Sequence, residues 1–355
     1  EAAPTGPLRN VLNLRGWQLT ALFRITHPGA TPMIGFGILG CGAHGERYLR
    51  HLAAGDVPGA RPAALWRQNQ TAAAALAGRY GVRAHRDWSA LIEDPAVDAV
   101  IVATPPGAHA APILAAARAG KPVLTEKPLT ANLADALTLA AALPTDARVM
   151  VAHTLRYAPA LLAARARLPD LGELYRIRIA QRLEPNAIAW QRDRTLAGGG
   201  SVILTGVHGF DLVRWFTGAT PGRVSACTRA LLGHPFEDLF EARFEYADRP
   251  LIATCEVAKF SDSRSALLEL VGTRGQCWVD YLGGRVEWIA GRGRRVIAEP
   301  GDQPTLPPTL TAFCRWLDEG GDCPVPLADG ITALRMADAC YRSAATGNPA
   351  SLNEP

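Results

Sequence analysis

Between Met33 and Ala152 the sequence alternates short apolar runs with amphipathic stretches rich in Ala and Leu. Short apolar runs are typical of buried strands, and amphipathic stretches between them are typical of helices that cover a sheet. Repeated strand–helix units of this kind predict a parallel sheet. The predicted strands are 34–39, 62–66, a weak one near Val82, 98–103, 122–125 and 148–152, and the predicted helices begin near Ala43, Thr71, Ser89, Ala110 and Asn132.

A G-x-G-x-x-G motif lies between the first predicted strand and the first predicted helix. In this position the first glycine permits a tight turn, the second lets the backbone approach a pyrophosphate, and the third lets the helix pack closely on the sheet. A turn with chance glycines is the alternative, but the strand–helix units that follow favour dinucleotide binding. The predicted cofactor-binding residues of this turn are Gly40, Gly42, Ala43, His44 and Gly45.

The end of the second predicted strand indicates which coenzyme is bound. NAD-selective sites usually place Asp or Glu there, about 20 residues after the glycines, to accept hydrogen bonds from the ribose. Here Trp66 and Arg67 occupy the position, and no carboxylate occurs between Asp56 and Asp87. Arg67 could pair with a 2′-phosphate, so NADP is the preferred cofactor and NAD the alternative. In the other interpretation Arg67 is a solvated loop residue and Trp66 only packs on the adenine.

After Glu173 the pattern changes to longer runs of alternating character, which predict one large antiparallel sheet. Turn residues at 248–250 and 273–275 predict hairpins between neighbouring runs. A helix is expected over 201–216, and two more close the chain at 309–319 and 329–345. The predicted strands are 175–183, 223–232, 239–246, 251–260, 266–271, 276–280, 285–289 and 294–298.

These patterns predict two domains, as expected for a chain of 355 residues. The fold class is α/β, with an NAD(P)-binding Rossmann domain over 33–152 and an α+β domain with a large, mainly antiparallel sheet over 153–355. The second domain is expected to bind substrate and to form oligomers, and its last helices are candidates to pack back on the first domain. Residues 1–32 form an N-terminal extension that need not be part of the fold.

Composition excludes several classes of protein. Hydrophobic residues make up 48% and charged residues 20%, which is typical of a globular chain. The net charge of +4 is small and the Arg residues are scattered, so we expect no nucleic-acid partner. No long uninterrupted apolar stretch predicts a membrane span. The seven cysteines form no C-x-x-C pair, which favours reduced thiols in a cytoplasmic protein, and we expect no metal site.

Two segments carry a resemblance to a known family. Residues 97–106 read VDAVIVATPP, and after His109 residues 119–128 read AGKPVLTEKP. Together with Gly198–Trp215, which contains G-x-H-x-x-D, they resemble the glucose-fructose oxidoreductase, inositol dehydrogenase and MocA family (Gfo/Idh/MocA). The resemblance implies hydride transfer on sugars, polyols or related compounds. It also places the following residues near the cofactor: Thr104, Pro105, His109, Glu126 and Lys127.

Lys127 and His208 are the catalytic candidates. Lys127 lies at the carboxyl end of a predicted strand, the edge where open α/β sheets bind ligands, and desolvation there would make its amine a usable proton acceptor. The resemblance implies an acid/base or substrate-orienting role for Lys127 and a proton-shuttling role for His208. Asp211, three residues later on the same helix face, is expected to orient the imidazole or to cap the local charge, and it is also a candidate substrate contact. The Lys127–Pro128 bond is a candidate for the cis form.

One position departs from the family pattern. Many active members carry Asp one helical turn before the His, where this chain has Leu204 followed by Thr205. Thr205 is a partial substitute, or the substrate is less polar. The resemblance places a substrate cleft around the region of the domain junction, and an Arg pair there could hold a carboxylate or phosphate. The residues placed in this cleft are His153, Arg156, Tyr157, Trp190, Arg192 and Arg194.

The sequence therefore predicts an NAD(P)-dependent oxidoreductase that transfers hydride between the nicotinamide and a carbinol or carbonyl carbon of a small sugar-like molecule. One alternative is nicotinamide-assisted elimination or glycoside cleavage. Another is a non-catalytic regulator that binds the cofactor, which Leu204 favours and the presence of Lys127 and His208 opposes. The resemblance further implies a homodimer or homotetramer formed through the C-terminal sheet.

Overall fold

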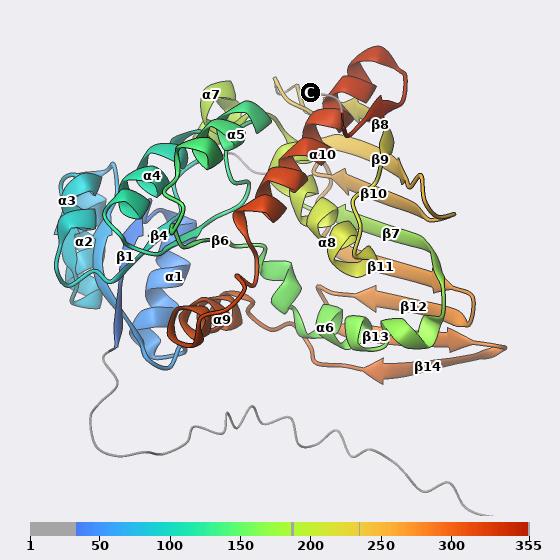
Figure 1. The fold of residues 1–355 in the computed structure, drawn as a ribbon, viewed down its shortest axis with the longest axis horizontal. Coiled ribbons are helices and arrows are strands. Elements are labelled where there is room, and N and C mark those ends of the chain that lie inside the picture. Colours follow the sequence, from blue (N-terminus) through green and yellow to red (C-terminus); the bar gives the residue numbers. More distant parts are fainter. Residues whose placement is uncertain (1–32, 186–187, 234, 354–355) are drawn as a thin grey trace, which may run out of the picture. The chain divides into compact units, whose positions relative to one another are not determined.

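The computed structural model describes residues 33–185, 188–233 and 235–353. The expectation for residues 1–32, an extension that need not be part of the fold, lies outside the described residues. Within the described ranges the strands form two sheets, one of six strands and one of nine. Figure 1 shows them side by side, with the C-terminal helix α10 running between the two.

The six-stranded sheet of the described chain is parallel throughout, as predicted, and its order is β3-β2-β1-β4-β5-β6. This is the order of a dinucleotide-binding fold, in which the chain reverses direction of winding between β1 and β4. The strands are β1 (Ile34–Leu39), β2 (Ala60–Trp66), β3 (Arg83–His85), β4 (Ala99–Val102), β5 (Val123–Thr125) and β6 (Val149–Val151).

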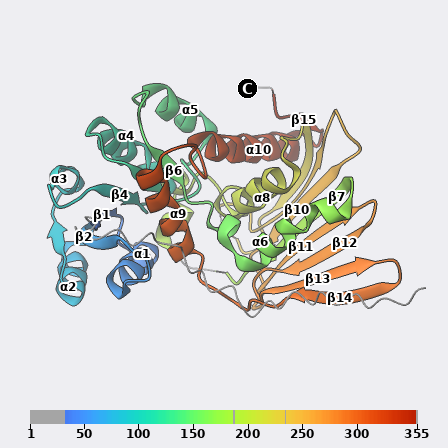
Figure 2. The same cartoon turned by 60° about the horizontal axis from the view of Figure 1, so that its bottom comes forward.

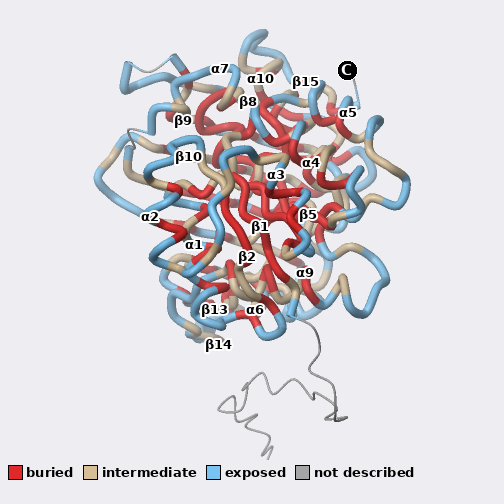
Figure 3. Tube along the Cα trace, turned by 90° about the vertical axis from the view of Figure 1, so that its left-hand side faces the viewer, coloured by how far each residue is buried: buried red, intermediate tan, exposed pale blue. Residues whose placement is uncertain are grey.

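Helices cover both faces of this sheet, so the central strands β1, β4 and β5 are buried on both sides, and Figure 3 shows this for β1 and β5. Helix α9 comes from the C-terminal part of the chain and contacts α1. The ring of Phe313 in α9 also lies 6.0 Å from the ring of Phe36 in β1. The helices are α1 (Ala43–Ala54), α2 (Gln70–Tyr80), α3 (Trp88–Glu93), α4 (Ala110–Arg118), α5 (Leu133–Ala142) and α9 (Leu306–Glu319).

The nine-stranded sheet has the order β14-β13-β12-β11-β7-β10-β9-β8-β15 within the described residues. Both predicted hairpins are present, β9–β10 and β11–β12. The sheet is mainly antiparallel, as predicted, and β7 and β10 are the one parallel pair among its described strands, because the chain crosses over through α8 and two further strands between them. The strands are β7 (Leu174–Arg182), β8 (Arg223–Arg229), β9 (Leu239–Glu245), β10 (Ile252–Ala258), β11 (Ser265–Gly272), β12 (Gly275–Asp280), β13 (Arg285–Ala290), β14 (Gly293–Ala298) and β15 (Ala350–Ser351).

The helices of the described residues that pack on this large sheet lie on one face, and Figure 2 shows α6, α8 and α10 together on that side. The rings of Phe240 and Phe244 from the sheet pack at 5.8 and 5.4 Å against Phe210 of α8. The remaining helical segments are α6 (Pro159–Ala166), α7 (Arg194–Ala197), α8 (Val207–Thr217), α10 (Leu327–Thr346), a π-helical turn η5 (Val202–Gly206), and the 3-10 turns η1 (Pro106–Ala108), η2 (Thr154–Tyr157), η3 (Leu168–Leu171) and η4 (Ala189–Arg192).

The helical segment Arg194–Thr217 is long and apolar enough to cross a membrane by length and composition. However, 78% of its most apolar window is buried inside the fold. A helix that is apolar on all sides is expected where it is enclosed by protein, and this one lies between the nine-stranded sheet and α10. Its packing therefore accounts for its hydropathy.

Candidate active site

Three strands of the parallel sheet end in register at one edge. Leu39 of β1 pairs with Val102 of β4, and Val102 pairs with Thr125 of β5. The segments that follow these strands therefore begin side by side at the carboxyl edge. They are the glycine turn, the Thr104–Pro105 segment and Glu126–Lys127, which are the parts that the sequence predicted to meet.

The glycine turn has the geometry that its three glycines predict. Gly40 has a positive φ of 86°, and a Cβ on Gly45 would lie 2.5 Å from the Gly40 carbonyl oxygen, so both positions exclude larger residues. A Cβ on Gly42 would meet no described atom within 4 Å. The turn is held from below by Trp66, whose carbonyl oxygen accepts hydrogen bonds from the Gly40 and Cys41 amides at 3.1 and 3.0 Å.

The N-terminus of α1 is open to an anion. Asn69, Asp87 and Asn132 cap the N-termini of α2, α3 and α5 with their side chains, but α1 begins at Gly42, which has no side chain to cap it. The first amides of a helix lack partners within the helix and carry partial positive charge. Open space over Gly42 and uncapped amides together fit a pyrophosphate.

Arg67 follows directly after β2 and is half-buried beside this turn. Its charge acts on Cys41, where burial raises the pKa of the thiol to about 12, the carboxylate of Glu46 adds to the shift, and Arg67 opposes it. Trp66 donates its indole N–H to the Arg86 carbonyl at 3.3 Å, which fixes the ring at the edge of the sheet. Within the described chain the loop after β2 presents Arg67 and amides but no carboxylate.

Glu126 lies at the centre of a buried hydrogen-bond cluster. Its Oε1 accepts from the Tyr48 hydroxyl and contacts His44 Nε2, both at 2.6 Å, and its Oε2 accepts from the Lys127 amide at 3.1 Å. Burial opposes its ionisation, but His44, Lys127 and Tyr48 outweigh burial and hold the pKa of this carboxyl well below its usual range. Glu126 and His44 were predicted as cofactor contacts; in the structure they contact each other, and their roles toward the cofactor stay predictions. Glu126 thus contacts both His44 of the glycine turn and the main chain of Lys127.

Lys127 Nζ donates a hydrogen bond to the Leu204 carbonyl oxygen at 2.9 Å. Burial lowers the pKa of Lys127 to about 8, Glu126 opposes this shift, and the positive charge of Lys259 adds to it. The Lys127–Pro128 bond is cis, as predicted. Leu204 lies in the π-helical turn η5, a type of turn that often occurs at functional sites.

His208 lies one turn after Leu204 and is half-buried, with a buried Nδ1 that has no hydrogen-bond partner among the described residues. Burial, Lys127 and His153 together hold the pKa of His208 well below its ordinary value, so the ring is neutral at pH 7. Asp211 was expected to orient this ring or to cap the local charge, and among the described residues it makes no hydrogen bond to His208. Asp211 instead receives both a 2.9 Å and a 2.5 Å hydrogen bond from Arg156.

The Arg156 side chain forms ion pairs with two carboxylates inside the protein. Besides its two bonds to Asp211 it donates to Asp329 at 2.8 Å, and Arg214 donates to the other oxygen of Asp329. Arg156 and Asp211 thus satisfy the charge of each other, and their roles in substrate binding stay predictions. His153 is buried nearby, 3.9 Å from Asp211, and burial lowers its pKa.

His109 was predicted to contact the cofactor, but its side chain is fully buried. Its ring nitrogens lie 2.7 Å from the Thr104 carbonyl oxygen and 3.2 Å from that of Leu129, so it ties the segment after β4 to the segment after β5. Thr104 and Pro105 remain half-exposed at the edge of the sheet. The buried His109 side chain therefore stabilises the arrangement of these two segments and is not exposed to a ligand.

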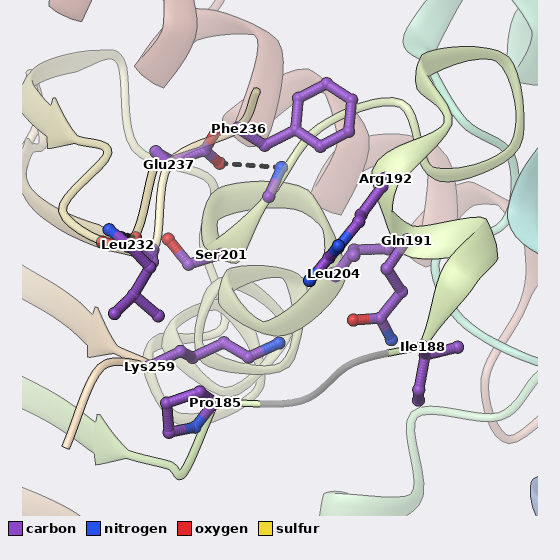
Figure 4. A pocket seen from close by; sticks show the side chains of 12 residues that line it. Pro185, Ile188, Gln191, Arg192, Ser201, Leu204, Leu232, Phe236, Glu237 and Lys259 are labelled. Atoms are coloured by element: carbon purple, nitrogen blue, oxygen red, sulfur yellow. Dashed lines mark hydrogen bonds between the residues drawn. The ribbon is translucent and has the colours of Figure 1, made fainter. Parts of the chain in front are cut away.

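A pocket opens beside Leu204, and Figure 4 shows its walls. Of the predicted cleft residues it includes Arg192, while Arg194 supports it by stacking 5.0 Å from the Phe236 ring. Thr205 is buried and does not line this pocket, and its role as a partial substitute for the carboxylate stays a prediction. Trp190 and Tyr157 are half-buried near the domain junction. The lining residues are Pro185, Ile188, Gln191, Arg192, Gly200, Ser201, Leu204, Leu232, Phe236, Glu237, Asp238 and Lys259.

Sequence reasoning missed two residues of this region. Tyr48 lies one helical turn after His44, so the spacing on α1 could have indicated that both reach the same partner. Lys259 follows a predicted strand, and no local pattern marks it. Its position beside the pocket depends on pairing between distant strands.

Two family models match the chain. The description "Oxidoreductase family, NAD-binding Rossmann fold" covers residues 34–153, and "Oxidoreductase family, C-terminal alpha/beta domain" covers residues 169–352. The chain belongs to the Gfo/Idh/MocA oxidoreductase family. The resemblance drawn from the VATPP and EKP segments is thereby confirmed, as is the fold class.

Relatives of known activity cover most of the chain. It is 31% identical to inositol 2-dehydrogenase 2 of Saccharopolyspora erythraea, over 89% of this chain and 94% of that protein. It is 30% identical to D-xylose 1-dehydrogenase (NADP(+)) 2 of Haloferax volcanii, over 90% of this chain and 99% of that protein. A solved levoglucosan dehydrogenase in complex with NADH and levoglucosan has the same fold, with a TM-score of 0.81 and 22% identity over 90% of this chain and 100% of that one.

Proposed function

We propose that this protein is an NAD(P)-dependent dehydrogenase or reductase acting on CH–OH groups of a sugar, polyol or related cyclic alcohol. The observation that carries the proposal is the half-buried Lys127, whose amine has a lowered pKa and lies at the same sheet edge as an open glycine turn. Family membership and the activities of the inositol and xylose dehydrogenases support it.

The coenzyme would be held by residues that the structure leaves open. The pyrophosphate would bind at Gly40, Gly42, Ala43 and the first amides of α1, while Thr104 and Pro105 would flank the nicotinamide side. When bound, the coenzyme supplies the acceptor or donor of hydride.

NADP is the proposed coenzyme, because Arg67 could bond to a 2′-phosphate and no carboxylate of the β2 loop would repel it. Trp66 lies beside it at the same strand end. The family contains users of both coenzymes, so this assignment depends on the loop after β2.

Lys127 would manage the proton of the reacting hydroxyl. As the hydride leaves the carbinol carbon, the neutral amine accepts the hydroxyl proton, and the protonated amine returns it in the reverse direction. The Leu204 carbonyl fixes the amine, and Glu126 fixes the backbone that carries it. The neutral His208 ring would hydrogen-bond to the substrate hydroxyl or pass on its proton.

We further propose a cytoplasmic homodimer or homotetramer that assembles through the nine-stranded sheet. All seven cysteines are free thiols, which is typical of reducing compartments. Helices cover one face of the sheet and leave the other open for a second copy.

The proposal is tested with a panel of sugars, inositols, sugar nucleotides and dihydrodiols, followed by reduced-nicotinamide absorbance, with wild type beside Lys127→Ala. We expect turnover of at least one member with NADP⁺ or NAD⁺ and its loss in the variant. Equal turnover by the variant would contradict the role of Lys127. Coenzyme retained without net reduction would favour elimination chemistry, and coenzyme binding without any turnover would favour a regulator.

A further inference from the structure

Lys259 presents an unpaired positive charge to the pocket beside Leu204. It follows β10 directly and is half-buried, and its backbone amide donates to the Asp238 carbonyl at 2.8 Å, which anchors its main chain. Among the described residues no carboxylate lies within ion-pair distance of its amine. Its charge contributes to the lowered pKa of Lys127, so the two amines are close enough to interact.

Lysine is rare in this chain, which makes the position notable. Of 37 basic residues 34 are Arg and three are Lys, at positions 121, 127 and 259. Lys121 donates to the Asp94 carbonyl and Lys127 donates to the Leu204 carbonyl, both at 2.9 Å. Lys259 alone of the three, within the described chain, has an amine without an acceptor. An unpaired, half-buried ammonium is costly unless a ligand supplies the counter-charge.

A second cation approaches from the opposite wall. Arg192 lies at the end of η4, and the part of the chain that the structure describes offers its guanidinium no ion pair. Figure 4 shows the ends of Lys259, Arg192 and Gln191 directed toward the same space beside Leu204. The stack of Arg194 on Phe236 holds the segment that carries Arg192. Ammonium, guanidinium and amide N–H groups are all hydrogen-bond donors.

The two carboxylates that line the pocket have other partners. Glu237 Oε1 accepts from the Gly200 and Val202 amides and from the Tyr341 hydroxyl, at 3.1, 2.9 and 2.9 Å. Both oxygens of Asp238 accept from the amides of Leu231 and Leu232. These bonds fix the carboxylates against the main chain, and among the described residues neither carboxylate forms an ion pair with Lys259 or Arg192. Burial lowers the pKa of Lys259 and the nearby charge of Glu237 opposes that shift, so a bound anion would add to the effect of Glu237 and favour the ammonium.

We propose that this pocket binds the carboxylate or phosphate group of an anionic substrate through Lys259 and Arg192. The substrate class is then an acidic sugar or polyol, which names the substrate of the site under the proposed function and rests on that function. Leu204 fits this role, because a carboxylate at its position would repel the bound anion at close range. The carbinol carbon of such a substrate would face Lys127, on the other side of Leu204.

The test compares acidic and neutral sugars of matched stereochemistry on the NADP⁺-loaded protein. The pairs are glucuronate with glucose and galacturonate with galactose, and glucose 6-phosphate adds a phosphate arm. Titration calorimetry measures binding, and reduced-nicotinamide absorbance measures turnover. We expect at least one acid to bind about 10-fold or more tightly than its neutral partner, the effect of one charge-assisted contact. Tighter binding by the uronates or by the phosphate ester identifies the anion.

The matched variants are Lys259→Gln, Lys259→Arg and Lys121→Gln. We expect Lys259→Gln to abolish the preference for the acid and Lys259→Arg to keep much of it. Lys121→Gln makes the same substitution between α4 and β5, away from the lining of this pocket, and should leave the preference unchanged. Circular dichroism confirms that each variant is folded.

Neutral sugars that bind as tightly as the acids, acids that do not bind at all, or a Lys259→Gln variant with wild-type preference would each overturn the inference. In these cases turnover of a neutral polyol would leave the proposed function intact. Failure to bind either coenzyme would instead contradict the proposed function itself. The two failures are therefore distinguishable.

Discussion

The Lys127 amine and the Leu204 carbonyl oxygen are 2.9 Å apart, although 77 residues separate them in the chain. One belongs to the end of a strand in the parallel sheet and the other to a π-helical turn that packs on the large sheet. This bond places the amine where both domains meet and removes it from water. Desolvation is then the main reason why the pKa of Lys127 falls to about 8.

The first prediction concerns pH. Oxidation of an alcohol needs the neutral amine as base, so kcat should rise as pH increases through about 8 and level off above it. Reduction of the carbonyl compound needs the protonated amine, so its kcat should fall as pH increases over the same range. Measurement of kcat from pH 6 to 10 in both directions checks this. Lys127→Arg, which stays protonated, should lose the rise and retain coenzyme binding; an unchanged profile would exclude the amine as base.

The second prediction separates the roles of two glycines. Gly42→Ala adds a methyl group into open space, so the free energy of unfolding should stay within about 1 kcal/mol of wild type while NADP⁺ binding weakens about 10-fold or more. Gly45→Ala drives a Cβ to 2.5 Å from the Gly40 carbonyl oxygen and should lower the melting temperature. Calorimetric titration and thermal unfolding distinguish the two. Wild-type coenzyme affinity in Gly42→Ala would contradict binding at this turn.

The third prediction concerns coenzyme choice. Arg67→Asp replaces a cation that could pair with the 2′-phosphate by a carboxylate that could bind the ribose hydroxyls. We expect the ratio of kcat/KM for NADP⁺ over NAD⁺ to fall about 10-fold or more. Arg79→Asp is a control, since Arg79 pairs with Glu46 on the exposed surface. A ratio that responds equally to both substitutions would indicate a general effect of charge.

The fourth prediction concerns the buried pair Arg156–Asp211. Asp211→Ala leaves the Arg156 guanidinium without its main partner in a site where the carboxylate is only 2% exposed. Removing one member of a buried ion pair costs about 3 to 5 kcal/mol of unfolding free energy. Asp170→Ala breaks the exposed pair with Arg167 and should cost less than about 1 kcal/mol. Urea unfolding measures both, and equal losses would show that the buried pair adds little.

Much of the fold could be predicted because its signals are local. The strand, glycine turn and helix over 34–54 are specified by neighbouring residues, and the observed β1 has the predicted bounds. The short helices α6 and α7 were not predicted, because eight and four residues give too little periodicity. The parallel pairing of β7 with β10 depends on contacts between segments far apart in sequence, which no local pattern specifies.

The same division holds for the site. The sequence singled out Lys127 as a catalytic candidate because the residues around it form a recognisable family segment. The partner of Asp211 was missed, because helical spacing pointed to His208 at three residues while the true partner, Arg156, is 55 residues away. Lys259 was missed for the same reason. Spacing along one helix can suggest a contact, but only the folded arrangement of both domains decides which charges meet.

The last prediction concerns assembly. On the face of the large sheet without helices, Leu267 is 48% exposed and Trp278 is 41% exposed. Exposed apolar side chains on a broad flat sheet indicate a surface that another protein covers, here a second copy of the chain. Trp278→Glu should shift the mass in light scattering from dimer or tetramer toward monomer. Leu137→Glu, an equally exposed position on α5, should leave the mass unchanged. A wild-type monomer at micromolar concentration would contradict assembly through this face.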